Sequence, residues 1–119
     1  MEIKFRKCTI CGNIVWSFNN IDVTCCNNTM KELIPNSIDA SFEKHVPTYE
    51  ISVDKIIIKV NHVMEENHYI RWIIMVTDTE VFCKEFKPFE EPIAVFDYKG
   101  KCEIYSYCNL HGLWVNNVE

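Results

Sequence analysis

The sequence is poor in glycine and has no long hydrophobic run. It contains three glycines in 119 residues, and its longest apolar segment, residues 72–76, has only the length of a strand. A membrane-spanning helix needs roughly 18 or more apolar residues. Residues 1–4 also lack the apolar core with which a secretory leader begins. We therefore expect a cytoplasmic protein that does not span a membrane.

Positive charge is also scarce. Twelve lysines and arginines stand against 17 aspartates and glutamates, the net charge is -5, and no basic run extends beyond residues 4–7. Nucleic-acid-binding surfaces need clustered cations, so we expect no nucleic acid partner. An anionic substrate would need local positive charge, because the field of the whole protein repels it. The apolar fraction of 48% indicates a folded chain.

Cysteine, by contrast, is abundant. Seven cysteines in a cytoplasmic chain favour metal binding or catalysis over disulfides, and an odd number cannot pair completely within one chain. Four of them lie in the first 35 residues: Cys8, Cys11, Cys25 and Cys26. So short a segment buries little apolar surface, and a bound metal could stabilise it by about 10–16 kcal/mol. A tetrahedral sulfur site suits zinc or a single iron, and the spacing leaves both open.

Strand signals dominate the rest of the chain, beyond a boundary near residues 35–37. Short separators and the lack of a helical period predict seven strands, at residues 49–53, 56–60, 69–77, 81–86, 93–98, 101–108 and 113–118. This number of short strands favours an antiparallel β-sandwich of immunoglobulin-like type. We therefore expect a mainly β protein, with a metal module at residues 1–36, which holds one short strand at 14–16, and a sandwich at residues 37–119.

The four histidines form the second group of candidate ligands. Each of His45, His62, His68 and His111 could, taken alone, be an ordinary loop residue. His62 and His68 are six positions apart, which is about 20 Å along a strand and about 120° around a helix, so only a loop could bring both to one metal. Cys108 and His111 also flank a strand end next to a glycine. Loops are where a sandwich gathers function.

Neutral imidazoles with one thiolate favour a borderline transition metal over magnesium or calcium. If the four imidazoles lie in one plane, Cys108 becomes axial and the opposite face stays open, as metal catalysis requires. One all-sulfur set and one mostly imidazole set in a single small protein suggest redox iron.

These residues resemble those of desulfoferrodoxin, the two-iron class of superoxide reductase. The resemblance runs essentially end to end. The motifs that carry it are Cys8-Thr9-Ile10-Cys11-Gly12-Asn13-Ile14-Val15, Cys25-Cys26, Glu43-Lys44-His45-Val46-Pro47, His62-Val63-Met64-Glu65-Glu66-Asn67-His68-Tyr69-Ile70 and Tyr107-Cys108-Asn109-Leu110-His111-Gly112-Leu113-Trp114.

The resemblance implies a desulforedoxin-like module that holds a ferric Fe(Cys)4 centre, with Cys8, Cys11, Cys25 and Cys26 as its ligands. It implies a second, catalytic iron, with equatorial His45, His62, His68 and His111 and axial Cys108. The implied reaction is the one-electron reduction of superoxide to hydrogen peroxide in oxidative-stress defence. A rubredoxin-like donor would restore the ferrous state, and the protein would be a homodimer.

Glu43 and Lys44 are the catalytic residues that the resemblance implies. Lys44 would supply the local cation that attracts superoxide and would hold water for protonating the product. Glu43 would bind the oxidised iron after the product leaves. The alternative is an exposed charged loop of little energetic consequence.

The sequence departs from the family pattern at two positions. Asn27 stands where the family usually has glycine, and asparagine tolerates the left-handed backbone that such a turn needs. Val63 stands where proline is usual after the first loop histidine, and the loss of proline loosens the backbone beside His62.

Three alternatives remain open at this point. The chain could be a non-catalytic iron electron carrier or a zinc-stabilised binding module, or its iron could act as a dismutase. Cys83 and Cys102 lie outside both ligand sets and are expected to be small buried residues. They could instead form a redox-sensitive disulfide if their Cα atoms lay within about 7 Å.

Overall fold

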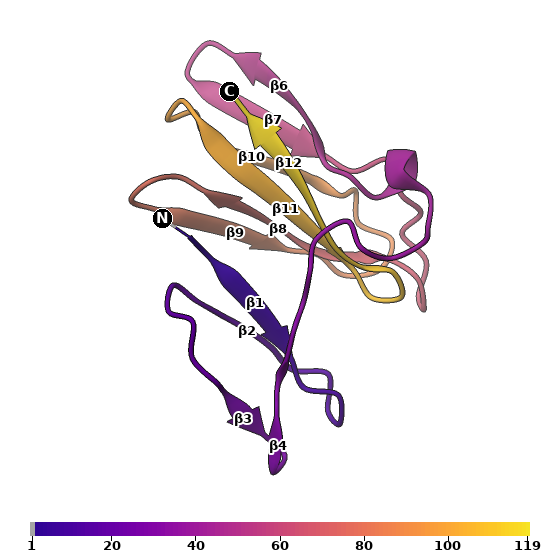
Figure 1. Ribbon diagram of the computed structural model, residues 1–119. Coiled ribbons are helices and arrows are strands. Elements are labelled where there is room, and N and C mark those ends of the chain that lie inside the picture. The colour runs from indigo at the N-terminus through magenta and orange to yellow at the C-terminus, as the bar shows by residue number, and fades with distance from the viewer. Residues whose placement is uncertain (1) are drawn as a thin grey trace. The chain divides into compact units, whose positions relative to one another are not determined.

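Strands make up nearly all of the regular structure in the computed structural model, which describes residues 2–119 (Figure 1). The prediction of a mainly β protein with antiparallel sheets is confirmed. Among the described residues the one helix is η1 (Phe42–Lys44), a single 3₁₀ turn, and no helix has the length and apolar character needed to cross a membrane. The contacts divide the chain into two units, Met1–Ile34 and Pro35–Glu119.

The first unit is built from very short strands. β1 (Lys4–Lys7) lies between β2 (Ile14–Ser17) and β5 (Lys31–Glu32), and β3 (Thr24–Cys25) forms a hairpin with β4 (Asn28–Thr29). The strand predicted at residues 14–16 is confirmed. Few apolar side chains described in this unit are buried: Ile3, Phe5, Cys8 and Met30. So small a core is consistent with a segment that a metal stabilises.

The second unit consists of two antiparallel sheets (Figure 1). The smaller sheet has the order β10-β7-β6 and the larger has the order β12-β11-β8-β9. The strands are β6 (Thr48–Ser52), β7 (Lys55–Lys59), β8 (Ile70–Val76), β9 (Val81–Glu85), β10 (Ile93–Asp97), β11 (Cys102–Cys108) and β12 (Gly112–Val118). All seven predicted strands are therefore present, each within about one residue of its expected ends.

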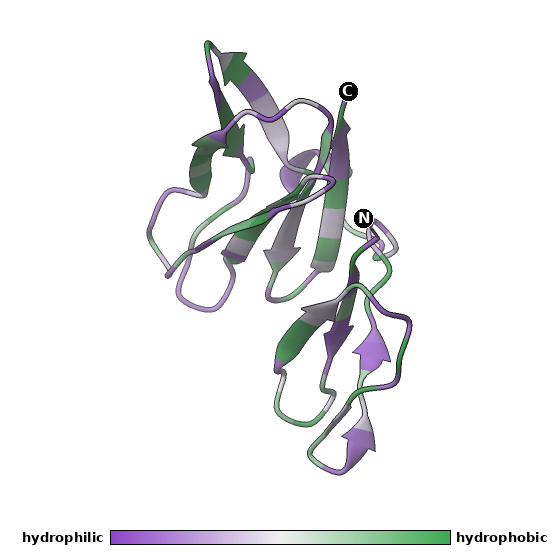
Figure 2. Cartoon of the chain, turned by 90° about the vertical axis from the view of Figure 1, so that its left-hand side faces the viewer, coloured by the Kyte–Doolittle hydropathy of each residue, from purple (hydrophilic) through white to green (hydrophobic). Residues whose placement is uncertain are grey.

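One hydrophobic core joins the two sheets. Alternate residues of the strands point to it, and it includes Ile56 and Ile58 of β7, Ala94 of β10 and, from the larger sheet, Ile73, Met75, Ile104 and Val118. Figure 2 shows hydrophobic residues concentrated on the strands and hydrophilic ones in several connecting loops. The unit is thus a two-layer sandwich. Its fourth strand, β9, pairs with β8 in the larger sheet, whereas the constant-type immunoglobulin arrangement places that strand beside the fifth.

Antiparallel pairing brings three loops to the same end of the sandwich. β6 begins opposite the end of β7, because Thr48 pairs with Lys59, and Cys108 at the end of β11 pairs with the first residues of both β8 and β12. The segment before β6, the loop at residues 60–69 and the loop at residues 109–111 therefore meet there. All four histidines lie in these three segments.

Two candidate metal centres

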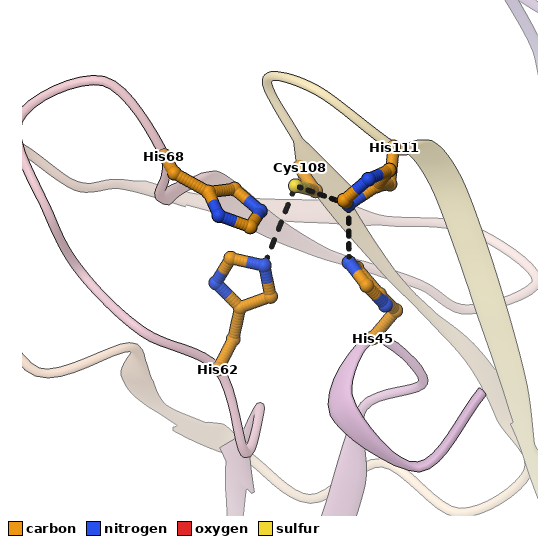
Figure 3. Close-up of side chains that lie close together, drawn as sticks. All are labelled: His45, His62, His68, Cys108 and His111. Carbon is orange, nitrogen blue, oxygen red and sulfur yellow. Dashed lines mark hydrogen bonds between the residues drawn. The ribbon is translucent and has the colours of Figure 1, made fainter. Parts of the chain in front are cut away.

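Five predicted ligands meet at the loop end of the sandwich: His45, His62, His68, Cys108 and His111 (Figure 3). Their candidate ligand atoms all lie within 4.8 Å of one another. The expectation that a loop carries His62 and His68 is confirmed. Residues 60–69 connect β7 to β8, and their one element of regular structure is an isolated bridge between Glu65 and His68.

The four imidazoles form a closed ring. His45 contacts His62 and His111, and His68 contacts the same two residues, with ring centroids 4.6–5.1 Å apart and planes inclined by 65–90°. Cys108 Sγ lies 3.4 Å from His62 Nε2 and 3.9 Å from His111 Nδ1. This arrangement suits a metal bound by four ring nitrogens and by one sulfur ligand from Cys108.

Hydrogen bonds select the nitrogen that each ring offers. His45 Nδ1 lies 2.6 Å from the Ser41 carbonyl, and His62 Nδ1 bonds the Val63 carbonyl. Because a carbonyl only accepts, each Nδ1 carries the proton and each Nε2 is left as a ligand. His111 points its Nδ1 to His45 Nε2, at 3.1 Å.

His68 gives the strongest indication that the cluster fits a metal. Its Nε2 is buried and has no hydrogen-bond partner, and it is the one such side-chain atom among the described residues. A buried, unsatisfied polar atom costs about 1–3 kcal/mol. A metal ion within the ring would satisfy it, and it would also satisfy the three other ring nitrogens that point inward.

Burial sets the protonation of the cluster. It lowers the pKa of His45, and it lowers the pKa of His62 to about 4. These imidazoles are therefore neutral near pH 7 and available as ligands. Burial raises the pKa of the Cys108 thiol, which is fully buried. A bound metal cation would lower the pKa of this thiol and deprotonate it. Four neutral imidazoles and one thiolate are a donor set that fits a borderline transition metal.

A pocket of about 450 Å³ opens over the ring. All four histidines line it and Cys108 does not, so the thiol lies behind the imidazoles and the pocket in front of them. Lys44 lines the pocket, as its predicted role requires. Glu43 is exposed on η1 and is not among the lining residues.

Sequence reasoning missed three polar residues that line this pocket: Asp39, Ser41 and Glu65. Glu65 was within reach, because it lies in the loop between His62 and His68. A turn brings it back beside His68, since its N–H donates to the His68 carbonyl at 2.9 Å. Asp39 and Ser41 had no signal in the sequence, because their positions depend on how the segment before η1 crosses the sandwich.

The second ligand group consists of Cys8, Cys11, Cys25 and Cys26, whose sulfur atoms lie within 4.8 Å of one another. Cys11 Sγ is 3.6 Å from Cys25 Sγ, and Cys25 Sγ is 3.9 Å from Cys26 Sγ. The backbone N–H of Cys11 points to Cys8 Sγ at 3.5 Å, in the geometry typical of a metal-binding Cys-x-x-Cys turn.

The protonation of the four thiols favours a bound cation. The Cys11 backbone N–H lowers the pKa of Cys8 to about 6, whereas hydrogen bonds to Cys11 and Cys8 raise the pKa of Cys25 to about 12. One thiolate therefore forms readily and opposes the ionisation of its neighbours. A tetrahedral metal ion would remove that conflict, so this group also fits a metal.

Cys83 and Cys102 do not form a disulfide. They lie on β9 and β11 with β8 between those strands, and Cys83 is level with Tyr105, three residues from Cys102, so the two cysteines are more than about 9.5 Å apart, the width of two strand spacings. The disulfide hypothesis is therefore wrong. Cys102 is buried in the core as expected, but Cys83 is exposed on the outer face of the sheet.

The chain is similar to proteins of one family. A family model described as Desulfoferrodoxin matches residues 37–117. A desulfoferrodoxin of Syntrophotalea carbinolica is 39% identical over 119 residues, covering 95% of this chain and 94% of that protein. A superoxide reductase of Pyrococcus horikoshii is 36% identical over 114 residues, covering 76% of this chain and 97% of that protein.

A solved structure agrees along nearly the whole chain. The crystal structure of the superoxide reductase from Treponema pallidum superposes with a TM-score of 0.80 at 26% identity. The alignment covers 98% of this chain and 99% of that one.

Proposed function

This chain belongs to the desulfoferrodoxin family, and we propose that it is a superoxide reductase that converts superoxide to hydrogen peroxide at the centre of four histidines and Cys108. One observation carries the proposal: a ring of imidazoles faces an open pocket, with a buried thiol behind it. An electron carrier or a zinc-stabilised module would have no use for that pocket.

The reaction needs one electron and two protons for each superoxide. Iron(II) bound at this centre would supply the electron, and the protons must come from the pocket side. His45, His62 and His68 would hold the iron through Nε2, His111 through Nδ1 and Cys108 through its thiolate. The four histidines line the pocket and Cys108 does not, so a substrate in the pocket would approach the ring on the side away from the thiol.

Charge brings the substrate in. Lys44 is the single cation among the residues that line the pocket, so it attracts the superoxide anion against the net charge of -5. Its ammonium group also holds water from which the product takes protons. Glu43 follows Phe42 on the same turn, exposed and outside the residues that line the pocket, and in this proposal its carboxylate would serve the oxidised centre.

The first unit is, in this proposal, a desulforedoxin-like module at residues 1–36 with a ferric Fe(Cys)4 centre. The sandwich at residues 37–119 is of immunoglobulin-like type. A rubredoxin-like protein serves as electron donor, and the protein works as a cytoplasmic homodimer. The match of the family model to residues 37–117 and the contact boundary after Ile34 support this division.

The test is the yield of peroxide. Anaerobically reduced protein is mixed with superoxide in the presence of excess electron donor, and the peroxide formed is divided by the superoxide consumed. A reductase gives one peroxide for each superoxide. One peroxide for every two superoxides would mean a dismutase, or a carrier beside which superoxide decays spontaneously, and would overturn the proposal.

A further inference from the structure

Asn109 connects two of the loops that carry the ligands of the histidine centre. It follows Cys108 directly and makes three hydrogen bonds to the backbone on either side of His68. Its Oδ1 accepts from the Tyr69 N–H at 2.9 Å, its Nδ2 donates to the Asn67 carbonyl at 2.9 Å, and its own N–H donates to the Tyr69 carbonyl at 3.2 Å.

These bonds stand where regular pairing stops. The ladder between β11 and β8 shifts register between Tyr107 and Cys108 and ends with Cys108 paired to Ile70, one residue before Asn109. The Asn109 side chain takes the place of the missing backbone acceptor. It pairs with Tyr69, the last loop residue before β8.

His68 depends on this connection more than His45 and His62 do. His45 and His62 have a carbonyl bonded to Nδ1, and His45 is also stacked on Trp114 at 4.9 Å. Within residues 2–119, no carbonyl bonds His68 Nδ1, and the His68 backbone makes only the two bonds that close the turn with Glu65.

We propose that Asn109 is a positioning residue that fixes His68 relative to Cys108 and His111, so that three of the five ligands are aligned before the metal binds. Hydrogen-bonded groups behind metal ligands set their orientation, and losing one typically costs about 10- to 100-fold in metal affinity. Asn109 differs from most such groups because it holds the backbone of a ligand loop rather than an imidazole nitrogen.

The test is the iron affinity of each centre in the full-length protein, measured by chelator competition in wild type and in Asn109→Ala. We expect the affinity of the histidine centre to fall by about 10- to 100-fold. The four-cysteine centre is an internal control and should keep its affinity. Asn117→Ala, which truncates an exposed asparagine on β12, should match wild type at both centres.

Two further results keep the inference falsifiable. Asn109→Asp retains the acceptor for Tyr69 but turns an oxygen to the Asn67 carbonyl, so it should fall between wild type and alanine. In the metal-free wild type, the Tyr69 amide should exchange with solvent slowly. An affinity in Asn109→Ala within two-fold of wild type, equal losses at both centres, or a freely exchanging Tyr69 amide would overturn the role.

The inference rests on the proposed histidine centre but not on its reaction. Its readouts are metal affinity and amide exchange. A protein that bound iron through this set and yielded one peroxide for two superoxides would refute the proposed reductase and leave the role of Asn109 intact.

Discussion

Lys44 is the residue on which the charge argument depends, because it is the single cation beside the pocket while Asp39 and Glu65 are anions there. We predict that Lys44→Ala lowers the second-order rate constant with superoxide by about two- to four-fold at low ionic strength, the size expected for one charge several ångströms away in water. The effect should vanish near 1 M salt, where the screening length is about 3 Å.

Rapid mixing at several ionic strengths measures this effect. Lys101→Ala is the matched control, because that lysine is exposed and precedes β11 at the opposite end of the sandwich. An unchanged rate in Lys44→Ala at low salt would rule out the steering role.

Glu65 should act in the opposite sense. Its carboxylate lines the same pocket and repels an anion, so we predict that Glu65→Gln raises the rate with superoxide by about two-fold at low ionic strength and that this gain disappears near 1 M salt. Glu65→Asp keeps the charge and should resemble wild type. So should Asp78→Asn, in the exposed turn after β8. A slower Glu65→Gln would instead assign the carboxylate a role in proton delivery.

The half-buried imidazole of His62 makes the metal-free protein sensitive to acid. Its pKa is lowered from 6.5 to about 4 on folding, so the unfolded chain binds more protons between those values. We predict that the unfolding free energy of the metal-free protein falls as the pH drops from 7 to 5, and that His62→Gln makes this slope shallower. Denaturant unfolding at a series of pH values measures it, and a flat profile in wild type would contradict the prediction.

The metal-ligand residues were the most predictable feature of this protein. All nine predicted ligands fall into the two groups expected, because the cysteines and histidines stand in short motifs whose spacing is informative. Asp39, Ser41 and Glu65 were not found, since acidic and hydroxyl residues are common on any surface. Only the folded loops decide which of them face the pocket.

Among the secondary-structure elements, the hairpin of β3 and β4 depends on a tight turn with a left-handed backbone. Cys26 and Asn27 form its two-residue turn, with φ of +53° and +60°, as a type I′ turn requires. The expectation that Asn27 adopts a left-handed backbone is confirmed. Its side chain is what allows a non-glycine residue there, because asparagine visits this region more readily than most residues.

We predict that Asn27→Gly leaves the stability of the metal-loaded protein unchanged or slightly higher, whereas Asn27→Val lowers it by about 1–2 kcal/mol, the cost of a left-handed β-branched residue. Thermal or denaturant unfolding measures both. Asn28→Val is the matched control, because Asn28 lies beside the turn in the extended strand β4. Equal effects of valine at the two positions would contradict the turn argument.

The strands of the sandwich were predictable because their apolar residues alternate and their separators are strong turn formers. The strands of the first unit were not, apart from β2. β1 reads as a basic run, yet it buries Phe5, and Arg6 is also buried with Nη1 donating to Ser17 Oγ at 3.0 Å. β3, β4 and β5 have two residues each, too few to show any period.

At the scale of the whole molecule, the two centres share no ligand and lie in different units. The cysteine ligands span residues 8–26, within the first unit, and the histidine centre draws on residues 45–111 of the second. Spacing alone indicated only that loops must gather these ligands. The antiparallel order of the sheets decides that three loops meet at one end.

This separation leads to a prediction for the whole protein. Cys11→Ser should abolish iron binding at the four-cysteine centre and leave the histidine centre filled, so the iron content falls from two to one per chain. The rate of the reduced protein with superoxide should stay within two-fold of wild type, because the pocket, Lys44 and all five ligands of that centre lie outside the first unit. Metal analysis and rapid mixing measure the two quantities on the same sample.

Cys108→Ser is the reciprocal variant, and should keep the iron of the first unit while losing the reaction. If Cys11→Ser emptied both centres, the two units would depend on each other for folding. The proposal that each centre binds its iron independently would then be wrong.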